Sequence, residues 1–142
     1  TDPDGIEGPS GEASGLGLLD VKTVLSGDKS LIEQIGAEAS SGEPVRGYEM
    51  HIGRTEGPDT LRPWLTLADG RPEGAISADG RVFATYLHGV FAADGFRRGF
   101  LERVGSVSHD TMYEASVEDT LDELALYMER HLDLEAILSI AI

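Results

Sequence analysis

A histidine stands directly after an apolar strand pattern in the second half of the chain. Residues 81–87 read Arg-Val-Phe-Ala-Thr-Tyr-Leu, and His88 and Gly89 follow at once. A strand that is apolar on both faces belongs in the middle of a sheet, and α/β enzymes place their sites where such strands end. His88 is therefore a candidate general base, and Gly89 leaves room beside it for a substrate or another backbone. The alternative is a buried, hydrogen-bonded histidine with a purely structural role.

Two further polar side chains alternate along an earlier strand pattern. Residues 45–52 place Tyr48 and Met50 on one side of a strand, and Glu49 and His51 on the other. Glu49 and His51 could contact a shared ligand, which makes them candidate substrate-binding residues. The alternative is a structural or solvent-facing role, because a one-sided sheet exposes its alternating polar residues.

Other kinds of site find little support in the sequence. His109 lies in a turn-like stretch and His131 near the end of an acidic helix pattern, and neither is expected to be functional. The histidines lack the spacing of a zinc site and the glycines form no phosphate loop, so we expect no metal or cofactor within these residues. Cysteine is absent, which excludes disulfides, thiolate metal sites and a cysteine nucleophile within this sequence.

The composition is that of a soluble globular domain. With 142 residues, of which 40% are hydrophobic and 26% charged, the chain can form one domain with a core. No apolar run approaches the roughly 20 residues that cross a bilayer, and no signal peptide is visible, so we expect a cytoplasmic protein without a membrane partner. The net charge of −15 argues against nucleic acid as a partner.

The strands that must position His88 are separated by turn signals. Beyond residues 45–52, apolar patterns predict strands at residues 64–68, 74–77 and 82–87. Asp69-Gly70 and Asp79-Gly80 lie between these strands, and the second pair predicts a hairpin.

Two helices are expected after the strands. Asp94 can cap a helix that runs through residues 96–103 and stops at Gly105. A pattern similar to a capping box at residues 116–119 predicts the start of a second helix with a broad apolar face. Residues 134–142 are apolar enough to pack back on the domain.

The start of the chain is loop-like. Residues 1–15 are rich in glycine and acidic side chains, and the apolar run at residues 17–25 does not decide between strand and loop. Because the sequence opens on a loop composition without a methionine, we expect further elements upstream.

Three segments together resemble the glutamine amidotransferase domain of cobyric acid synthases. The segments are residues 15–23 (GLGLLDVKT), 47–55 (GYEMHIGRT) and 85–91 (TYLHGVF), in the order and approximate spacing of that family. The resemblance covers residues 1–104 well and the acidic C-terminal helices more loosely. Cobyrinic acid a,c-diamide synthases share the domain type and are the nearest alternative, but the first two segments favour cobyric acid synthases.

The resemblance implies an α/β fold, namely the later part of a flavodoxin-like class I amidotransferase domain with a mixed sheet and packed helices. In such domains a cysteine attacks the side-chain amide of glutamine, and a histidine activates the thiol and protonates the departing ammonia. His88 matches that histidine. The ammonia would pass to a corrinoid-binding domain of the same chain, which uses ATP and Mg²⁺ to amidate adenosylcobyrinic acid a,c-diamide in cobalamin biosynthesis.

Two features depart from a complete amidotransferase. Val90 stands two residues after His88 where a Cys-His-Glu triad has its glutamate, and cobyric acid synthases resemble this chain in that respect, so a dyad is expected. The cysteine should lie shortly before Thr1, which makes residues 1–142 a partial domain that cannot hydrolyse glutamine by itself. A catalytically dead amidotransferase-like binding module is the alternative of a different class.

Overall fold

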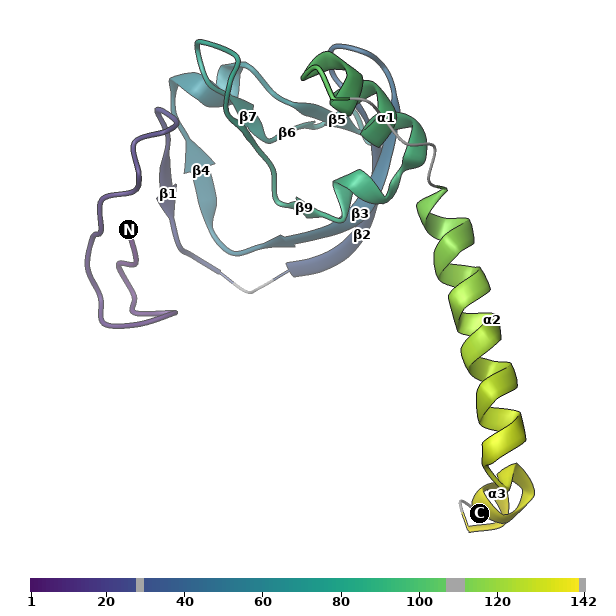
Figure 1. The fold of residues 1–142 in the computed structure, drawn as a ribbon. Coiled ribbons are helices and arrows are strands. Elements are labelled where there is room, and N and C mark those ends of the chain that lie inside the picture. Colours follow the sequence, from purple (N-terminus) through teal and green to yellow (C-terminus); the bar gives the residue numbers. More distant parts are fainter. Residues whose placement is uncertain (28–29, 107–111, 141–142) are drawn as a thin grey trace.

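Short strands curl around an open interior, one helix packs on them, and a second helix extends away from this body (Figure 1). The computed structural model describes residues 1–27, 30–106 and 112–140. The strands are β1 (Lys22–Val24), β2 (Ser30–Glu38), β3 (Pro44–His51), β4 (Arg54–Glu56), β5 (Leu65–Leu67), β6 (Pro72–Glu73), β7 (Ala75–Ile76), β8 (Phe83–Ala84) and β9 (Leu87–His88). The helices are the 3-10 turns η1 (Pro58–Leu61) and η2 (Val90–Ala92), and α1 (Asp94–Arg103), α2 (Tyr113–His131) and α3 (Leu134–Ile140).

The long strands β2 and β3 form the centre of the main sheet. They pair antiparallel along nearly their whole length, and the sheet order is β6-β5-β2-β3-β9. β1 pairs with β4, and β7 with β8, in two small separate sheets. All strand pairs in the described part of the chain are antiparallel. The chain therefore has the predicted α/β composition, but the mixed sheet is not found within these residues.

Several predicted elements are confirmed. β3 matches the strand predicted at residues 45–52, and β5 lies within the strand predicted at 64–68. The hairpin at Asp79-Gly80 joins β7 to β8, with Ile76 opposite Phe83. β2 was not predicted, because residues 30–38 place apolar side chains at adjacent as well as alternate positions and so give no period of two.

The single strand predicted at residues 82–87 is wrong. It divides into β8 and β9, which belong to different sheets. The chain leaves the first sheet at Thr85 because the Thr85 hydroxyl and the Tyr86 backbone N–H both donate to the side chain of Glu73. β7 lies within the strand predicted at 74–77, and Gly74, whose φ is 74°, separates it from β6.

The helix starts differ from the predictions. Ala93 is the N-cap of α1, and Asp94 lies inside the first turn, where its carboxylate accepts hydrogen bonds from Arg97 and from the backbone N–H of Tyr113. Gly105, with φ of 78°, follows the end of α1 as expected.

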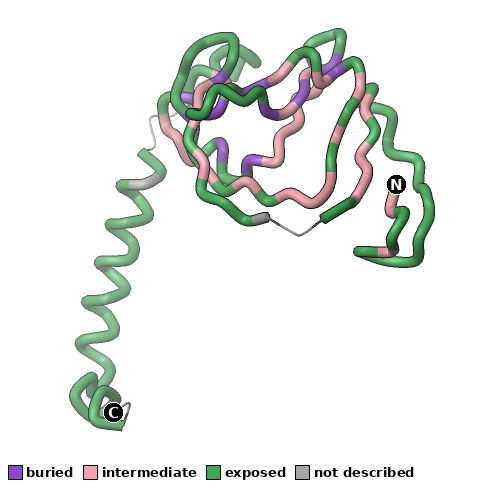
Figure 2. The backbone as a smooth tube through the Cα atoms, turned by 180° about the vertical axis from the view of Figure 1, so that it is seen from behind, coloured by how far each residue is buried: buried purple, intermediate pink, exposed green. Residues whose placement is uncertain are grey.

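The last two helices are exposed. α2 begins at Tyr113, three residues before the predicted capping box, so Ser116 lies within the helix. Every described side chain of α2 and α3 is exposed, as the green colour of both helices in Figure 2 shows. The expectation that the last segment packs back on the domain is therefore wrong for residues 134–140, while residues 141–142 lie outside the described residues. No helix in the described residues is long and apolar enough to span a membrane.

The core lies between the main sheet and α1. Its buried members come from β3, β5, β9 and the first part of the helical region: Val45, Trp64, Leu65, Leu87, Val90 and Phe96. The Trp64 ring lies 5.3–6.2 Å from four phenylalanine rings, centroid to centroid. Leu87 is 2% exposed, so the residue next to His88 in the sequence is fixed in this core.

Candidate active site

His88 is the last residue of β9, and Gly89 follows it in a left-handed conformation with φ of 82°. The predicted strand-end position is confirmed. The predicted environment is not, because β9 is an edge strand of the main sheet in the described residues and His88 is exposed. His88 is therefore not buried within the described residues.

The register between β3 and β9 decides which way His88 faces. Tyr48 lies opposite His88, and Glu49 opposite Leu87. Residues directly opposite each other share a face of the sheet, and neighbours along a strand point to opposite faces. His88 therefore lies on the same face as Tyr48, whereas Glu49 lies on the face that carries the buried Leu87.

Gly47 allows β3 and β9 to approach each other closely. A Cβ atom on Gly47 would lie 2.0 Å from the His88 carbonyl oxygen and 3.1 Å from Cγ of Leu87. The contact with the backbone oxygen is too short for any side chain, so this position requires glycine. Gly47 thus helps to define the position of His88 from the neighbouring strand.

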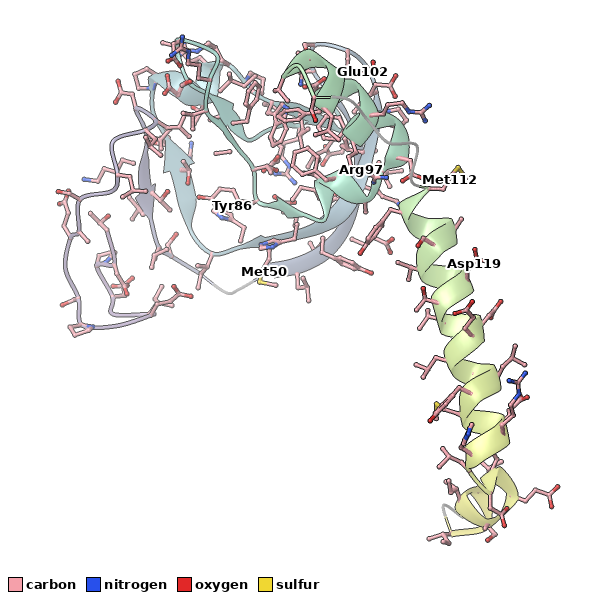
Figure 3. The ribbon with its side chains drawn as sticks, viewed as in Figure 1. Met50, Tyr86, Arg97, Glu102, Met112 and Asp119 are labelled. Carbon is pink, nitrogen blue, oxygen red and sulfur yellow. The ribbon has the colours of Figure 1, made fainter. Side chains whose placement is uncertain are left out.

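The face that carries His88, here called the outer face, is mostly apolar and exposed. Its other members from β2 and β3 are the apolar Leu31, Ile35, Tyr48 and Met50 and the charged Glu33 and Arg46. Leu31 and Ile35 are 62% and 60% exposed. Figure 3 shows Met50 on the outside of the curled sheet. The histidine therefore stands at the edge of an uncovered apolar surface.

Glu49 and His51 point the other way, into the interior of the curl. Both line a cavity of about 480 Å³, and His88 is not among the residues that line it. The Glu49 side chain is only 12% exposed, so the solvent-facing alternative is wrong for Glu49. Nδ1 of His51 is buried and has no hydrogen-bond partner among the described residues. The structure brings Glu49 and His51 together, but it does not bring them to His88.

Arg71 is the main partner of Glu49. Two nitrogens of its guanidinium group donate to the two carboxylate oxygens of Glu49 at 3.0 and 2.6 Å, and Gln34 donates at 3.2 Å. The hydrogen bonds from Arg71 lower the pKa of Glu49, partly opposed by burial. Glu49 is therefore a carboxylate at neutral pH. Arg71 could not be predicted as its partner, because the two residues lie 22 positions apart without a shared local pattern.

Three hydroxyl groups meet on the other side of the cavity. Oγ1 of Thr55 lies 2.6 Å from Oγ1 of Thr23 and 2.5 Å from Oη of Tyr86. Tyr86 points into the interior of the curl in Figure 3, and its ring centroid lies 4.0 Å from that of His51. The cavity therefore offers both hydroxyl groups and a carboxylate–guanidinium pair to a polar ligand.

Glu73 also lines the cavity, and it is buried, with 5% of its surface exposed. Burial raises its pKa, while hydrogen bonds from Thr85 and from the Tyr86 backbone N–H act in the opposite direction. The neutral acid is therefore favoured more than in an exposed glutamate. Glu73 could not be singled out from the sequence, since its partners follow 12 and 13 positions later.

The two other histidines of the sequence are His109 and His131. His131 lies at the end of α2, is exposed, and its Nδ1 lies 2.8 Å from the Tyr127 carbonyl oxygen. His109 lies outside the described residues. Within residues 1–27, 30–106 and 112–140, no group of three histidine, aspartate or glutamate residues could hold a metal ion.

A comparison with family models matches residues 1–96 to the CobB/CobQ-like glutamine amidotransferase domain. The match covers more than half of the chain and includes all nine strands. The chain belongs to this family. In this amidotransferase domain, the matched region contains His88, the outer face and the cavity, and it ends within α1.

Curated relatives extend the similarity to the C-terminal helices. The cobyric acid synthases of Methylocella silvestris and Cereibacter sphaeroides are each 54% identical to this amidotransferase chain over 140 residues, and that of Bradyrhizobium diazoefficiens is 52% identical. Each alignment covers 99% of the chain and 29% of the relative. The chain therefore spans less than a third of the length of these relatives. No solved structure matches it.

Proposed function

We propose that this chain is the histidine-bearing part of the glutaminase domain of a cobyric acid synthase. The observation that carries the proposal is His88, which stands exposed at the end of β9 within the region that matches the amidotransferase family. The similarity to cobyric acid synthases over nearly the whole chain supports this activity more than that of a cobyrinic acid a,c-diamide synthase.

In the proposed reaction His88 acts on a cysteine supplied by a segment outside this sequence. His88 takes the thiol proton, and the thiolate attacks the side-chain carbonyl carbon of glutamine. The C–N bond breaks, ammonia leaves with the proton from His88, and a γ-glutamyl thioester remains. Water then hydrolyses this thioester to glutamate and restores the thiol.

The outer face is the surface on which the cysteine-bearing segment would pack. Complete soluble domains rarely leave a contiguous apolar surface of this kind uncovered. His88 lies at the edge of the outer face, and β9 has an unpaired edge within the described residues, so a neighbouring element could bring a thiol to the imidazole. Such an element would complete a flavodoxin-like class I fold with a mixed sheet.

The remaining functions would belong to other parts of a longer cytoplasmic protein. A separate domain would bind ATP and Mg²⁺, receive the ammonia and amidate adenosylcobyrinic acid a,c-diamide. Glu49 and His51 remain candidate substrate-binding residues only through the cavity that they line, because they face away from His88.

The experiment that tests the proposed function identifies the substrate and the source of nitrogen. The full-length protein is incubated with ATP, Mg²⁺ and glutamine labelled with ¹⁵N in the side-chain amide, and with either adenosylcobyrinic acid a,c-diamide or cobyrinic acid. Mass spectrometry should show labelled amides on the diamide substrate. Labelled amides on cobyrinic acid alone would instead support the a,c-diamide synthase, and no labelled product would support a catalytically dead module.

A further inference from the structure

The segment that leads into His88 is held by a side chain and by one backbone hydrogen bond, from the Met50 N–H to the Tyr86 carbonyl oxygen at 3.1 Å, and not by a continuous strand ladder. β8 ends at Ala84 in one small sheet, and β9 begins at Leu87 in the main sheet. β9 itself pairs with β3 at only two positions. Between the two strands, Thr85 and Tyr86 cross from one sheet to the other, so this crossing determines where β9 starts and where His88 lies.

Glu73 binds both residues of the crossing. Its Oε2 accepts a hydrogen bond from the Thr85 hydroxyl at 2.6 Å, and its Oε1 accepts one from the Tyr86 backbone N–H at 2.7 Å. The Thr85 oxygen in turn accepts from the backbone N–H of Leu87 at 2.9 Å. These three contacts lead from Glu73 to the residue immediately before His88.

The position of Glu73 is itself well defined. It lies in β6, is 5% exposed, and the next residue, Gly74, packs against β8 so closely that a Cβ atom there would lie 2.4 Å from the Ala84 carbonyl oxygen. A buried acceptor in a fixed place can orient the groups that donate to it. Without Glu73, the Tyr86 N–H would have no acceptor of this kind in a half-buried site.

We propose that Glu73 is a positioning residue for His88, and that it acts through Thr85, Tyr86 and Leu87. This inference rests on the proposed function, in which His88 acts on a thiol and on ammonia. It also supplies what a cysteine–histidine dyad without a triad glutamate requires, namely a group that fixes the histidine indirectly. Val90 occupies the triad position, and its buried side chain cannot do so.

The proposal depends on hydrogen bonding and not on charge. In Glu73→Gln, the amide oxygen can accept from the Tyr86 N–H while the amide NH₂ donates to Oγ1 of Thr85. A threonine hydroxyl has two acceptor sites, so it can still accept from Leu87. Glu73→Ala removes both contacts to residue 73, those from Thr85 and from the Tyr86 N–H. Burial, which already favours the neutral form of Glu73, agrees with tolerance of a neutral amide.

The test uses the full-length protein and compares Glu73→Ala, Glu73→Gln and His88→Ala. Amidation is measured with glutamine and, separately, with added ammonia. We expect Glu73→Ala to lower kcat with glutamine by about 10- to 100-fold, because a displacement near 1 Å has this order of effect on a catalytic group. The KM for glutamine should change by less than about threefold, ammonia-dependent turnover should be unchanged, and Glu73→Gln should restore most of kcat.

Glu38→Ala is the matched control, because Glu38 is also a buried glutamate, 3% exposed, but contacts Trp64, Ser41 and Arg103 and not the crossing. It should lower stability without changing the ratio of the two activities. If Glu73→Ala abolishes both activities, Thr85→Val is the smaller change: it removes the two contacts of the Thr85 hydroxyl, keeps the one from the Tyr86 N–H, and should reproduce the selective loss.

The outcomes separate the two proposals. If His88→Ala retains glutamine-dependent turnover, the proposed function is wrong. If His88→Ala loses it but Glu73→Ala and Thr85→Val behave as wild type, or lose both activities equally, only the positioning role is wrong. Equal loss in Glu73→Gln and Glu73→Ala would also overturn it, since the carboxylate itself would then be required.

Discussion

At the scale of single residues, the carboxylate of Glu38 connects the sheet to α1. Its oxygens accept hydrogen bonds from Nε1 of Trp64 at 3.0 Å, from Ser41 at 2.6 Å and from Arg103 at 2.6 and 3.1 Å. Arg103 also lies over the Phe100 ring, 5.1 Å from its centroid. One buried acid thus satisfies donors from three parts of the chain, and the core aromatic side chains depend on it for their arrangement.

Glu38→Gln should lower the free energy of unfolding by about 2–3 kcal/mol at pH 7, because the buried network loses one of its two acceptor oxygens and the charge that strengthens its hydrogen bonds. Burial alone would raise the pKa of Glu38, but the hydrogen bonds from Arg103, Ser41 and Trp64 lower it overall from the ordinary value of 4.5. A lowered pKa in the folded state stabilises the protein above pH 4.5, and this contribution is lost as the pH falls further.

Urea denaturation of both proteins at several pH values checks this prediction. The difference between wild type and Glu38→Gln should shrink below about pH 4.5. Glu118→Gln, on the exposed face of α2, is the control and should change stability by less than about 0.5 kcal/mol. A difference that grows toward acid pH would contradict the assigned pKa direction.

At the scale of elements, the close pairing of β3 with β9 positions the strand end. Gly47→Ala should destabilise the protein by about 1–3 kcal/mol, because the added methyl group would overlap the His88 carbonyl group and force the strands apart. Gly99→Ala in α1 is the matched control. A Cβ atom there has no heavy atom within 4 Å outside its own helix, so this change should stabilise the helix by about 0.5–1 kcal/mol.

Thermal and urea unfolding of the two glycine variants measure this contrast. Equal effects of the two substitutions would show that the β3–β9 contact is looser than the structure indicates. In the full-length protein, Gly47→Ala should also reduce glutamine-dependent turnover more than ammonia-dependent turnover.

Only part of the strand arrangement could be predicted from the sequence. The strand-end position of His88 and the alternation along β3 could be predicted, because both are local patterns of period two. Which of the two alternating sets of side chains faces inward could not be predicted from the sequence. Glu49 and His51 face inward because Arg71 and Tyr86, far along the chain, meet them there. The break between β8 and β9 could not be predicted either, since it depends on Glu73 and not on a glycine or proline at residues 85–86.

At the scale of the whole molecule, two surfaces are uncovered in the described residues. One is the outer face with His88, and the other is the apolar side of α2, where Leu121 and Leu124 are each 51% exposed. A 19-residue helix whose described side chains are all exposed has only marginal stability in water. Uncovered apolar surfaces of this kind are expected when a chain spans only 29% of its relatives' length.

The chain by itself should not hydrolyse glutamine. Attack on the amide needs a thiolate, the sequence has no cysteine, and the hydroxyl groups near the cavity lie on the face away from His88. A coupled assay for ammonia should show no release above a blank without protein. Turnover by the chain that disappears in His88→Ala would mean that another nucleophile is present and that the proposed chemistry is wrong.

The measurement that tests the proposed role of this chain most directly is amidation by the full-length protein carrying His88→Ala. Glutamine-dependent turnover should fall by about two to four orders of magnitude, the usual cost of removing a general acid–base group. Ammonia-dependent turnover should stay close to wild type, because in the proposed function carboxylate activation would take place in another domain. His131→Ala, which changes an exposed histidine at the far end of α2, should leave both activities unchanged. If His88→Ala retains normal glutamine-dependent turnover, or loses ammonia-dependent turnover to the same degree, His88 does not have the catalytic role proposed for it.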